Sequence, residues 1–248
     1  MKNCLPKKLT RILLTAFCLS LFSTLSAKEP KLHIFTVASS WSIEFDQLVD
    51  SCDLQNLPID VVGIGGRLYV DRKFALSHQR VSRWPDEDVV LFIRANKGLV
   101  LASEETILER FLSFKAPIVF SGKVNAPSLP GLRKYFPPRL TKFKYPNSDA
   151  YIGYVKDVRE MLSDYNGSNS GMDEEKYLSL YYLYHLDEIA IDSLCQLFLP
   201  LGRVDSEEVL INSEAVQLIG SDNSACIVTG SAGEGSLYEE IYDKVVAP

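Results

Sequence analysis

The chain has 248 residues, of which 46% are hydrophobic and 23% are charged, and its formal net charge is −6. A chain of this length and composition can bury a sizeable core, which favours one globular domain. Because an acidic protein repels polyanions, we expect no nucleic-acid partner.

The first 27 residues have the pattern of a secretory signal peptide. An apolar run from Ile12 to Phe22 follows a basic start, and Leu25-Ser26-Ala27 offers a small-residue cleavage site. The run is shorter than the ~20 residues of a spanning helix, so we expect no transmembrane anchor after cleavage. Cleavage removes four cations and no acids, which leaves 22 Lys and Arg against 32 acids and a formal charge of −10. The four cations removed are Lys2, Lys7, Lys8 and Arg11. We therefore expect an exported protein with one domain at residues 28–248.

Three cysteines remain in the expected mature chain. Cys52, Cys195 and Cys226 are widely spaced, which does not match a zinc site and permits at most one disulfide. Buried thiols and one disulfide both remain open.

The first half of the mature chain alternates strand-like and helix-like patterns, which predicts an α/β fold with a mostly parallel central sheet and flanking helices. Neighbouring strands are expected from the apolar segments, and the third helix is expected to be capped by Ser103. The expected strands are Leu32–Val37, Ile59–Ile64, Val89–Ile93 and Pro117–Ser121, and the expected helices are Ile43–Cys52, Asp71–Val81 and the segment through Phe114.

The second half is less regular. Five prolines within residues 122–146 predict a loop there, with at most a short helix around Leu132–Tyr135. The polar residues 166–171 predict a second loop before a helical run, Asp173–Leu186. Further strands are expected at Leu194–Leu199, Glu208–Ile211 and Ala225–Thr229, and a final helix at Leu237–Val246.

Two cations follow the third expected strand. The apolar run Val89–Ile93 is typical of a strand buried on both faces, and Arg94 and Lys97 come directly after it. Ligand sites of such sheets lie at the carboxyl ends of the strands, so these cations are candidate ligand contacts.

Several segments, taken in order, resemble the glycosyltransferase domain of procollagen lysyl hydroxylases and related collagen glycosyltransferases. The resemblance spans nearly the whole mature chain, and it implies a GT-A-like glycosyltransferase fold that holds a sugar nucleotide across the carboxyl ends of the strands. It also implies a metal-dependent enzyme that moves glucose or galactose from UDP onto hydroxylysine or its galactose. The segments are "HIFTVAS" (33–39), "DVVLFIRANKGLVLAS" (88–103), "YPNSDAYIGY" (145–154), "MDEEKYLSLYYLY" (172–184), "IDSLCQLF" (191–198) and "CIVTGSAG" (226–233).

The chain departs from this family at the metal site. The family's third strand ends in Asp-x-x-Asp, whose carboxylates hold Mn²⁺, and a later His-Gly-Asn-Gly supplies another ligand. A divalent ion bound by carboxylates neutralises the diphosphate leaving group. The matching positions here are Arg94 and Lys97, and Thr229 followed by Gly230 stands at the histidine. We therefore predict no metal-ligating residues and do not expect Mn²⁺ as a cofactor.

The sugar pocket differs as well. The family's Asn-Ser-Gly-Gly is replaced by Asn147-Ser148-Asp149-Ala150, and its Asp-Asp-Gln by Asp173-Glu174-Glu175-Lys176, whereas Asp192 matches the family's Asp. The resemblance implies three catalytic carboxylates, Asp173, Glu174 and Asp192. It implies a donor-binding set of Arg94, Lys97, Asn147, Ser148, Thr229 and Gly230.

Three interpretations of Arg94 and Lys97 stay open. In the first, the two cations replace the metal and hold the diphosphate of a UDP-sugar, as in a metal-independent transferase. In the second, the fold persists without catalysis, as a module that binds a glycan or a protein acceptor. In the third, the cations are solvated residues of a surface turn. We favour the second, because all three expected metal ligands are replaced while the scaffold motifs remain.

Overall fold

The computed structural model describes residues 29–127, 131–213, 215–230 and 236–247. Lys31–Pro248 form one compact unit, and of the residues before it only Glu29 and Pro30 are described. The predicted signal peptide lies outside the described residues. In the described ranges, no helix is both long and apolar enough to cross a membrane.

Strands and helices alternate in the first half, as the apolar patterns predict. Ser103 caps α4 as expected, since its hydroxyl accepts a hydrogen bond from Thr106 N. The elements in order are β1 (Leu32–Val37), α2 (Ile43–Leu54), β2 (Ile59–Val62), α3 (Val70–Val81), β3 (Val89–Ile93), β4 (Gly98–Val100), α4 (Glu104–Ser113), β5 (Ile118–Lys123) and η1 (Arg133–Tyr135). They continue with β6 (Tyr145–Tyr154), α5 (Val155–Ser168), α6 (Glu174–Tyr184), β7 (Ala190–Asp192), β8 (Phe198–Pro200), η2 (Ser206–Glu208), β9 (Val209–Ile211), β10 (Val216–Leu218), β11 (Ile227–Thr229), α7 (Leu237–Ile241) and η3 (Tyr242–Val246).

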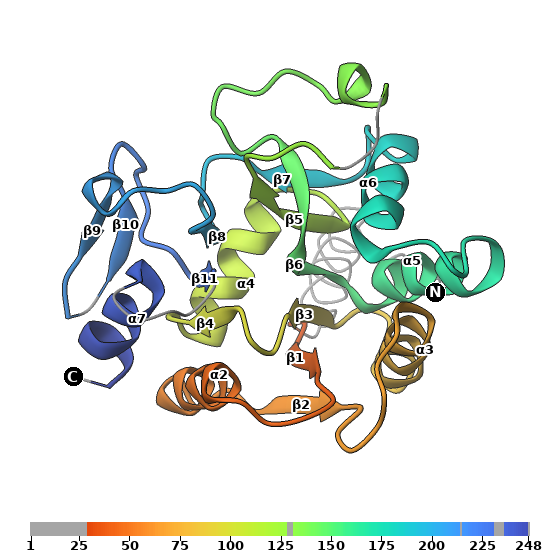
Figure 1. The fold of residues 1–248 in the computed structure, drawn as a ribbon, viewed down its shortest axis with the longest axis horizontal. Helices are drawn as coiled ribbons and strands as arrows, with labels where there is room; N and C mark the ends of the chain where they lie inside the picture. The colour runs from red at the N-terminus through yellow and green to blue at the C-terminus, as the bar shows by residue number, and fades with distance from the viewer. Residues whose placement is uncertain (1–28, 128–130, 214, 231–235, 248) are drawn as a thin grey trace, which may run out of the picture. The chain divides into compact units, whose positions relative to one another are not determined.

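The central sheet has the strand order β2-β1-β3-β6-β5-β7. Strand β6 is antiparallel to both of its neighbours, and the other strands share one direction. Helices α3, α5 and α6 cover one face of the sheet, and α2 and α4 cover the other (Figure 1). This arrangement confirms the predicted α/β class with flanking helices; the sheet is mostly parallel but mixed.

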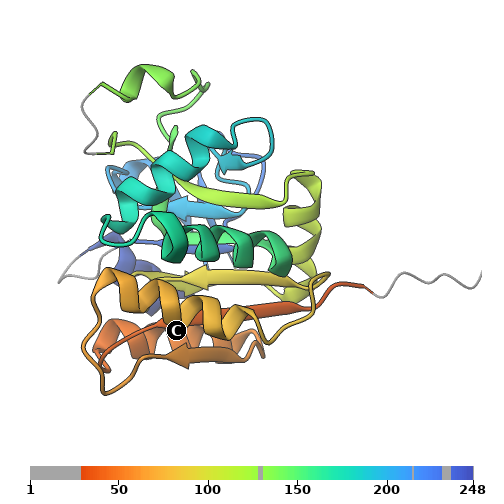
Figure 2. The same ribbon diagram turned by 90° about the vertical axis from the view of Figure 1, so that its right-hand side faces the viewer.

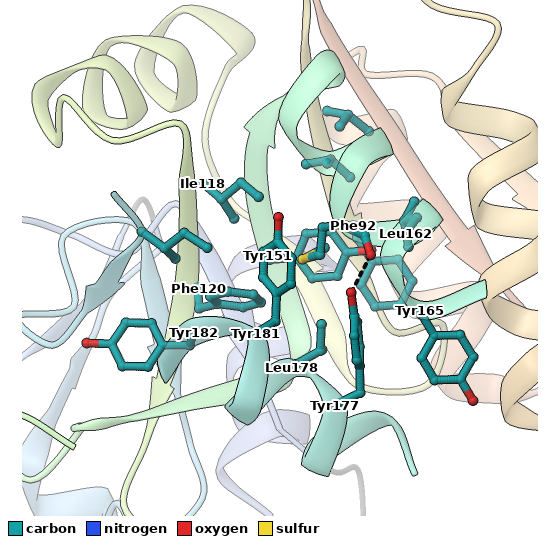
Figure 3. Packing of buried hydrophobic residues seen from close by; sticks show 14 of the residues in the cluster. Phe92, Ile118, Phe120, Tyr151, Leu162, Tyr165, Tyr177, Leu178, Tyr181 and Tyr182 are labelled. Carbon is teal, nitrogen blue, oxygen red and sulfur yellow. Dashed lines mark hydrogen bonds between the residues drawn. The ribbon is translucent and has the colours of Figure 1, made fainter. Parts of the chain in front are cut away.

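Alternate residues of β3 pack into two hydrophobic cores, one on each face of the sheet. Val90 and Phe92 belong to the core beneath α3, α5 and α6, whereas Leu91 and Ile93 belong to the core beneath α2 and α4. The first core is rich in aromatic rings, and Figure 3 shows Tyr151 of β6 between the helices and the sheet. Burial on both faces explains the continuous apolar run in the sequence.

The predicted neighbour of β3 was wrong. We expected Pro117–Ser121 among the first four strands, but β6 lies between β3 and the corresponding strand, β5. Strand β6 escaped prediction because Pro146 and the polar residues 147–149 are typical of a loop. Between the pairs Phe120–Tyr151 and Gly122–Pro146, β5 has one residue and β6 has four, so residues 147–150 form a bulge.

Other boundaries also differ from expectation. The strand expected at Leu194–Leu199 begins only at Phe198, because Cys195 adopts a left-handed φ of 55° in the preceding turn. The polar segment 166–171 is partly the last turn of α5. The expected final helix is α7 followed by a π-helix, η3. Cys52, Cys195 and Cys226 are buried and free.

A smaller sheet, with the strand order β4-β11-β8, lies beside the main sheet. It depends on a tight reversal after β3, in which Lys97 N donates to Arg94 O at 3.0 Å. A Cβ at Gly98 would lie 2.1 Å from Ile93 Cγ2, so the reversal requires glycine there. Gly98 in β4 pairs with Thr229 of β11, which brings Thr229 close to the end of β3.

Candidate functional site

The turn after β3 separates the two cations predicted to act together. Arg94 lines one pocket and Lys97 lines another. The first, called here the β1 pocket, has a volume of about 410 Å³ and lies at the carboxyl ends of β1 and β3. The second, the β11 pocket, has a volume of about 630 Å³. A ligand that touches both cations must therefore extend across both pockets.

Arg94 is held by two carboxylates. Its Nη2 lies 3.0 Å from Glu174 Oε2 and also donates to Ser148 Oγ at 3.1 Å. Its Nε lies 2.7 Å from Asp149 Oδ1, which is an ion-pair distance, although the N–H is not aligned for a hydrogen bond. The backbone supports this arrangement, since Arg94 N donates to Asp149 O at 2.8 Å. The β6 bulge thus carries both Ser148 and Asp149 to the end of β3.

Lys73 on α3 completes the group. Lys73 Nζ lies 2.5 Å from Glu174 Oε1, so the two oxygens of Glu174 contact two different cations. Lys73 Nζ also lies 4.8 Å from the centroid of the Phe92 ring, in a cation–π contact. We call Lys73, Arg94, Asp149 and Glu174 the charge cluster. Its formal charges cancel.

Burial and neighbouring charges shift the pKa values of Lys73 and Arg94 in opposite directions. Burial lowers the pKa of Lys73, and Glu174 only partly offsets this effect. Burial also acts to lower the pKa of Arg94, but the charges of Glu174 and Asp149 outweigh it and hold that pKa above its ordinary value. Arg94 therefore keeps its charge in the cluster.

The β11 pocket is lined by apolar residues and glycines, by five neutral hydrogen-bonding side chains, and by two lysines and two acids. Lys123 Nζ lies 2.5 Å from Glu175 Oε1, which neutralises part of this charge. Thr229 is 1% exposed, and its Oγ1 has no hydrogen-bond partner among the described residues. The polar lining residues are Lys97, Lys123, Asn125, Asn147, Asp149, Glu175, Thr229, Ser236 and Tyr238.

The predicted donor-binding residues come together only in part. Lys97, Asn147, Thr229 and Gly230 line the β11 pocket, and Gly230 N donates to Lys97 O at 2.9 Å. Asn147 Oδ1 accepts a hydrogen bond from Asp149 N at 3.1 Å, which stabilises the bulge. Ser148 instead contacts Arg94, as described above.

The three predicted catalytic carboxylates lie in different environments. Glu174 lines the β1 pocket but is engaged with Lys73 and Arg94. Asp173 is exposed and caps α6, where its carboxylate accepts from Lys176 N at 2.8 Å. Asp192 is fully buried and accepts backbone N–H hydrogen bonds. Neither Asp173 nor Asp192 lines either pocket, and their catalytic roles stay predictions.

Sequence reasoning missed Lys73 and gave Asp149 no role. Lys73 lies 101 residues from Glu174 and has no motif of its own. Asp149 did carry a signal, because an acid replaces a family glycine in the same chain in which Arg94 replaces a family acid. The described residues contain no group of three or more His, Cys, Asp or Glu side chains that could hold a metal ion. At the end of β3, Asp149 and Glu174 are each paired with a cation, and this arrangement does not suit Mn²⁺.

Comparisons with known proteins identify the family to which the chain is similar. A family model described as "PLOD GT domain" matches residues 28–234. Procollagen-lysine,2-oxoglutarate 5-dioxygenase 1 of Mus musculus is 23% identical over 205 residues, covering 73% of this chain and 27% of that protein. Uncharacterized protein R699 of Acanthamoeba polyphaga mimivirus is 33% identical over 112 residues, covering 44% of this chain and 24% of that protein.

The chain thus spans about a quarter of the length of these relatives. Among solved structures, A197 from STIV has a TM-score of 0.41 and 13% identity, covering 66% of this chain and 82% of that one. That score is too low to support a shared fold by itself.

Proposed function

This chain belongs to the PLOD GT domain family, and from that premise we propose that it is a glycosyltransferase-like domain that binds a carbohydrate without a metal ion. In this proposal it lacks Mn²⁺-dependent transfer from UDP-sugars and acts as a binding module. The observation that carries the proposal is the contact of Arg94 with both Asp149 and Glu174 at the end of β3.

The charge cluster opposes a divalent cation. Both Asp149 and Glu174 are already paired with a cation, so Mn²⁺ would have to approach Arg94 and Lys73 at close range. The repulsion of Mn²⁺ by the two cations offsets its attraction to the two carboxylates, so the neutral cluster supplies no net electrostatic attraction for a divalent ion. Binding of Mn²⁺ at this position is therefore unfavourable.

The same cluster offers little to a diphosphate, because its formal charges cancel. The β11 pocket suits a neutral sugar better, since hydroxyl groups both donate and accept hydrogen bonds. The amides of Asn125 and Asn147 line it, and Thr229 lies in its wall, where its Oγ1 is buried without a hydrogen-bond partner among the described residues. Pockets with a few well-placed polar groups are typical of small-molecule sites.

A metal-independent transferase is the second candidate. It is favoured by the position of Arg94 and Lys97 on one short turn, where each lines one of two pockets. In this alternative, a UDP diphosphate displaces Asp149 or Glu174 from Arg94 and Lys97 contacts the sugar side.

Isothermal titration calorimetry separates the two candidates. We expect glucose, galactose or a disaccharide of the two to bind with equal affinity in Mn²⁺ and in EDTA, and UDP not to bind. Metal-free UDP binding that is lost in Arg94→Gln would establish the second candidate instead. Mn²⁺-enhanced UDP binding would contradict both, and so would the failure of all these ligands to bind.

We also propose that the chain is exported, because of its basic start, apolar run and Ala27. Mass spectrometry of the protein from its native host should find a mature N-terminus at Lys28. An intact Met1 on a protein in the cytosolic fraction would contradict export.

A further inference from the structure

The segment that contains η1 and leads into β6 is strongly basic, in contrast to the rest of the chain. Residues 131–144, called here the cationic loop, contain five Lys or Arg and no Asp or Glu, whereas the whole chain has a net charge of −6. The loop projects from the body beyond the sheet in both ribbon views (Figures 1 and 2). Its cations are Arg133, Lys134, Arg139, Lys142 and Lys144.

Two arginines of the cationic loop are positioned by buried aromatic residues. Arg133 Nε donates to the hydroxyl of Tyr145 at 3.1 Å, and Arg139 Nη2 donates to that of Tyr182 at 2.9 Å. The buried ring of Phe136 contacts both tyrosines, with centroid distances of 5.0 Å to Tyr145 and 6.0 Å to Tyr182. Phe136 thereby anchors the loop between the two arginine supports.

The positive charge of these arginines is not neutralised by any carboxylate that the structure describes. Among the described residues, neither Arg133 nor Arg139 has a carboxylate oxygen within 4.0 Å, whereas Lys142 pairs with Glu208 at 2.7 Å. A phenol oxygen is neutral, and a guanidinium has five N–H donors, so most donors remain for a ligand. Because the side chains are already oriented, binding loses less conformational entropy.

Exposed apolar groups accompany the charges. Leu140 is 99% exposed and Tyr135 is 56% exposed, and Lys134 Nζ lies 5.0 Å from the centroid of the Tyr135 ring. Arginine and tyrosine are the residue types most enriched at the energetic centres of protein interfaces. An isolated leucine exposed to this degree gains free energy when a partner covers it.

We propose that the cationic loop binds an acidic segment of a protein partner. Carboxylates match the planar fork of guanidinium in bidentate contacts, and a polypeptide also supplies apolar side chains that can cover Leu140 and Tyr135. A sulfated polysaccharide supplies anions but no such side chains. The acidic remainder of the chain repels nucleic acid and anionic membranes, whose charge density is higher.

The proposal stands on the loop itself and does not require a sugar in the β11 pocket. The cationic loop nevertheless adjoins the β11 pocket, because residues that flank the loop in sequence line that pocket. These residues are Lys123, Ala126 and Asn147. A partner bound to the loop therefore lies beside the pocket.

Fluorescence anisotropy with the full chain tests the proposal. The probe is a fluorescein-labelled 12-residue peptide of four Glu-Glu-Leu repeats, and the control is the matching peptide of Lys-Lys-Leu repeats. We expect saturable binding of the Glu peptide that weakens with added salt, and no binding of the Lys peptide. Equal binding of both peptides, or no binding of either at low salt, would overturn the proposal.

Paired variants locate the binding. Arg133→Gln with Arg139→Gln should weaken Glu-peptide binding about tenfold, as expected when two charged contacts are lost. The control, Arg83→Gln with Lys156→Gln, makes the same change in net charge at two exposed cations elsewhere and should leave affinity unchanged. Equal losses in both proteins would overturn the proposal, as would tighter binding of heparin fragments or phosphatidylserine vesicles than of the peptide.

Discussion

Arg94 Nη2 lies 3.0 Å from Glu174 Oε2 and so joins the end of β3 to the first turn of α6. The other oxygen of Glu174 contacts Lys73 of α3. One carboxylate therefore ties together three elements that are distant in sequence. An ion-pair network occupies the place at which the resemblance to collagen glycosyltransferases implies a metal ion.

Removal of the Glu174 charge should destabilise the fold. In Glu174→Gln, the largely buried Lys73 and the partly buried Arg94 each lose a counter-charge. Breaking such pairs costs about 2–4 kcal/mol, which is close to the range for buried ion pairs. Urea unfolding at pH 7 measures this change in the free energy of unfolding.

The adjacent Glu175→Gln is the matched control. Glu175 is 39% exposed and pairs with Lys123, so its loss should cost less than about 1 kcal/mol. Equal losses in the free energy of unfolding for the two variants would show that the charge cluster stabilises the fold no more than the pair of Glu175 with Lys123 does.

Sequence periodicity predicted the elements that a strong local pattern defines. The bounds of β1 and β3 agree with the predicted Leu32–Val37 and Val89–Ile93, because both are continuous apolar strands. Strand β6 was missed because its bulge places polar residues where alternation was expected. Periodicity does not encode a bulge, whose geometry comes from pairing with β3 and β5.

The site was predictable only where a motif marked it. Arg94 and Lys97 stood out because they follow a buried strand. The role of Lys73 depends on contact with a residue 101 positions away, and such pairing comes from tertiary structure. Sequence spacing also suggested that Arg94 and Lys97 act on one ligand group, whereas the tight turn through Gly98 directs them to different pockets.

A variant of Asp192 can distinguish a structural role of this residue from a catalytic one. Its Oδ1 accepts from Gln196 N at 2.9 Å, and its Oδ2 accepts from Leu197 N and Phe198 N at 2.7 and 2.8 Å. In Asp192→Asn, the side-chain NH₂ cannot accept these bonds, which should cost about 2–3 kcal/mol. Urea unfolding measures this loss, and sugar titration of the folded variant should give an unchanged Kd. A folded variant with lost sugar affinity would instead support the predicted catalytic role.

Buried tyrosines should make the fold sensitive to alkali. Burial raises the pKa of Tyr177 and of Tyr238 above the ordinary value of 10.0, and it raises the pKa of Tyr165 to about 12. Above pH 10 these groups ionise in the unfolded chain before they ionise in the fold, so stability falls as pH rises. Each such group lowers the free energy of unfolding by about 1.4 kcal/mol per pH unit between pH 10 and its own pKa in the fold.

Urea unfolding at pH 10.5, 11 and 11.5, with tyrosinate absorbance at 295 nm, measures this slope. Lys73 has a lowered pKa and acts in the opposite direction only below its ordinary value of 10.5, so the chosen range excludes it. Tyr177→Phe should reduce the slope by about 1.4 kcal/mol per pH unit. A slope unchanged by this variant would show that Tyr177 ionises in the fold as readily as in the unfolded chain.

Thr229 should show opposite effects on stability and on binding. Its Oγ1 is buried in the lining of the β11 pocket and has no partner in the part of the chain that the structure describes, and such a group is costly in the free protein. Thr229→Val should therefore raise the free energy of unfolding by about 1 kcal/mol. If a sugar hydroxyl is the missing partner, the same variant should weaken sugar binding by about threefold to tenfold.

Thr36→Val is the control, because Thr36 Oγ1 is also buried and unpartnered among the described residues, but Thr36 lines neither pocket described above. This variant should therefore gain stability with no change in sugar affinity. Calorimetric titration with galactose and glucose, together with urea unfolding, measures both effects. Unchanged sugar affinity in Thr229→Val would show that the sugar does not contact this hydroxyl.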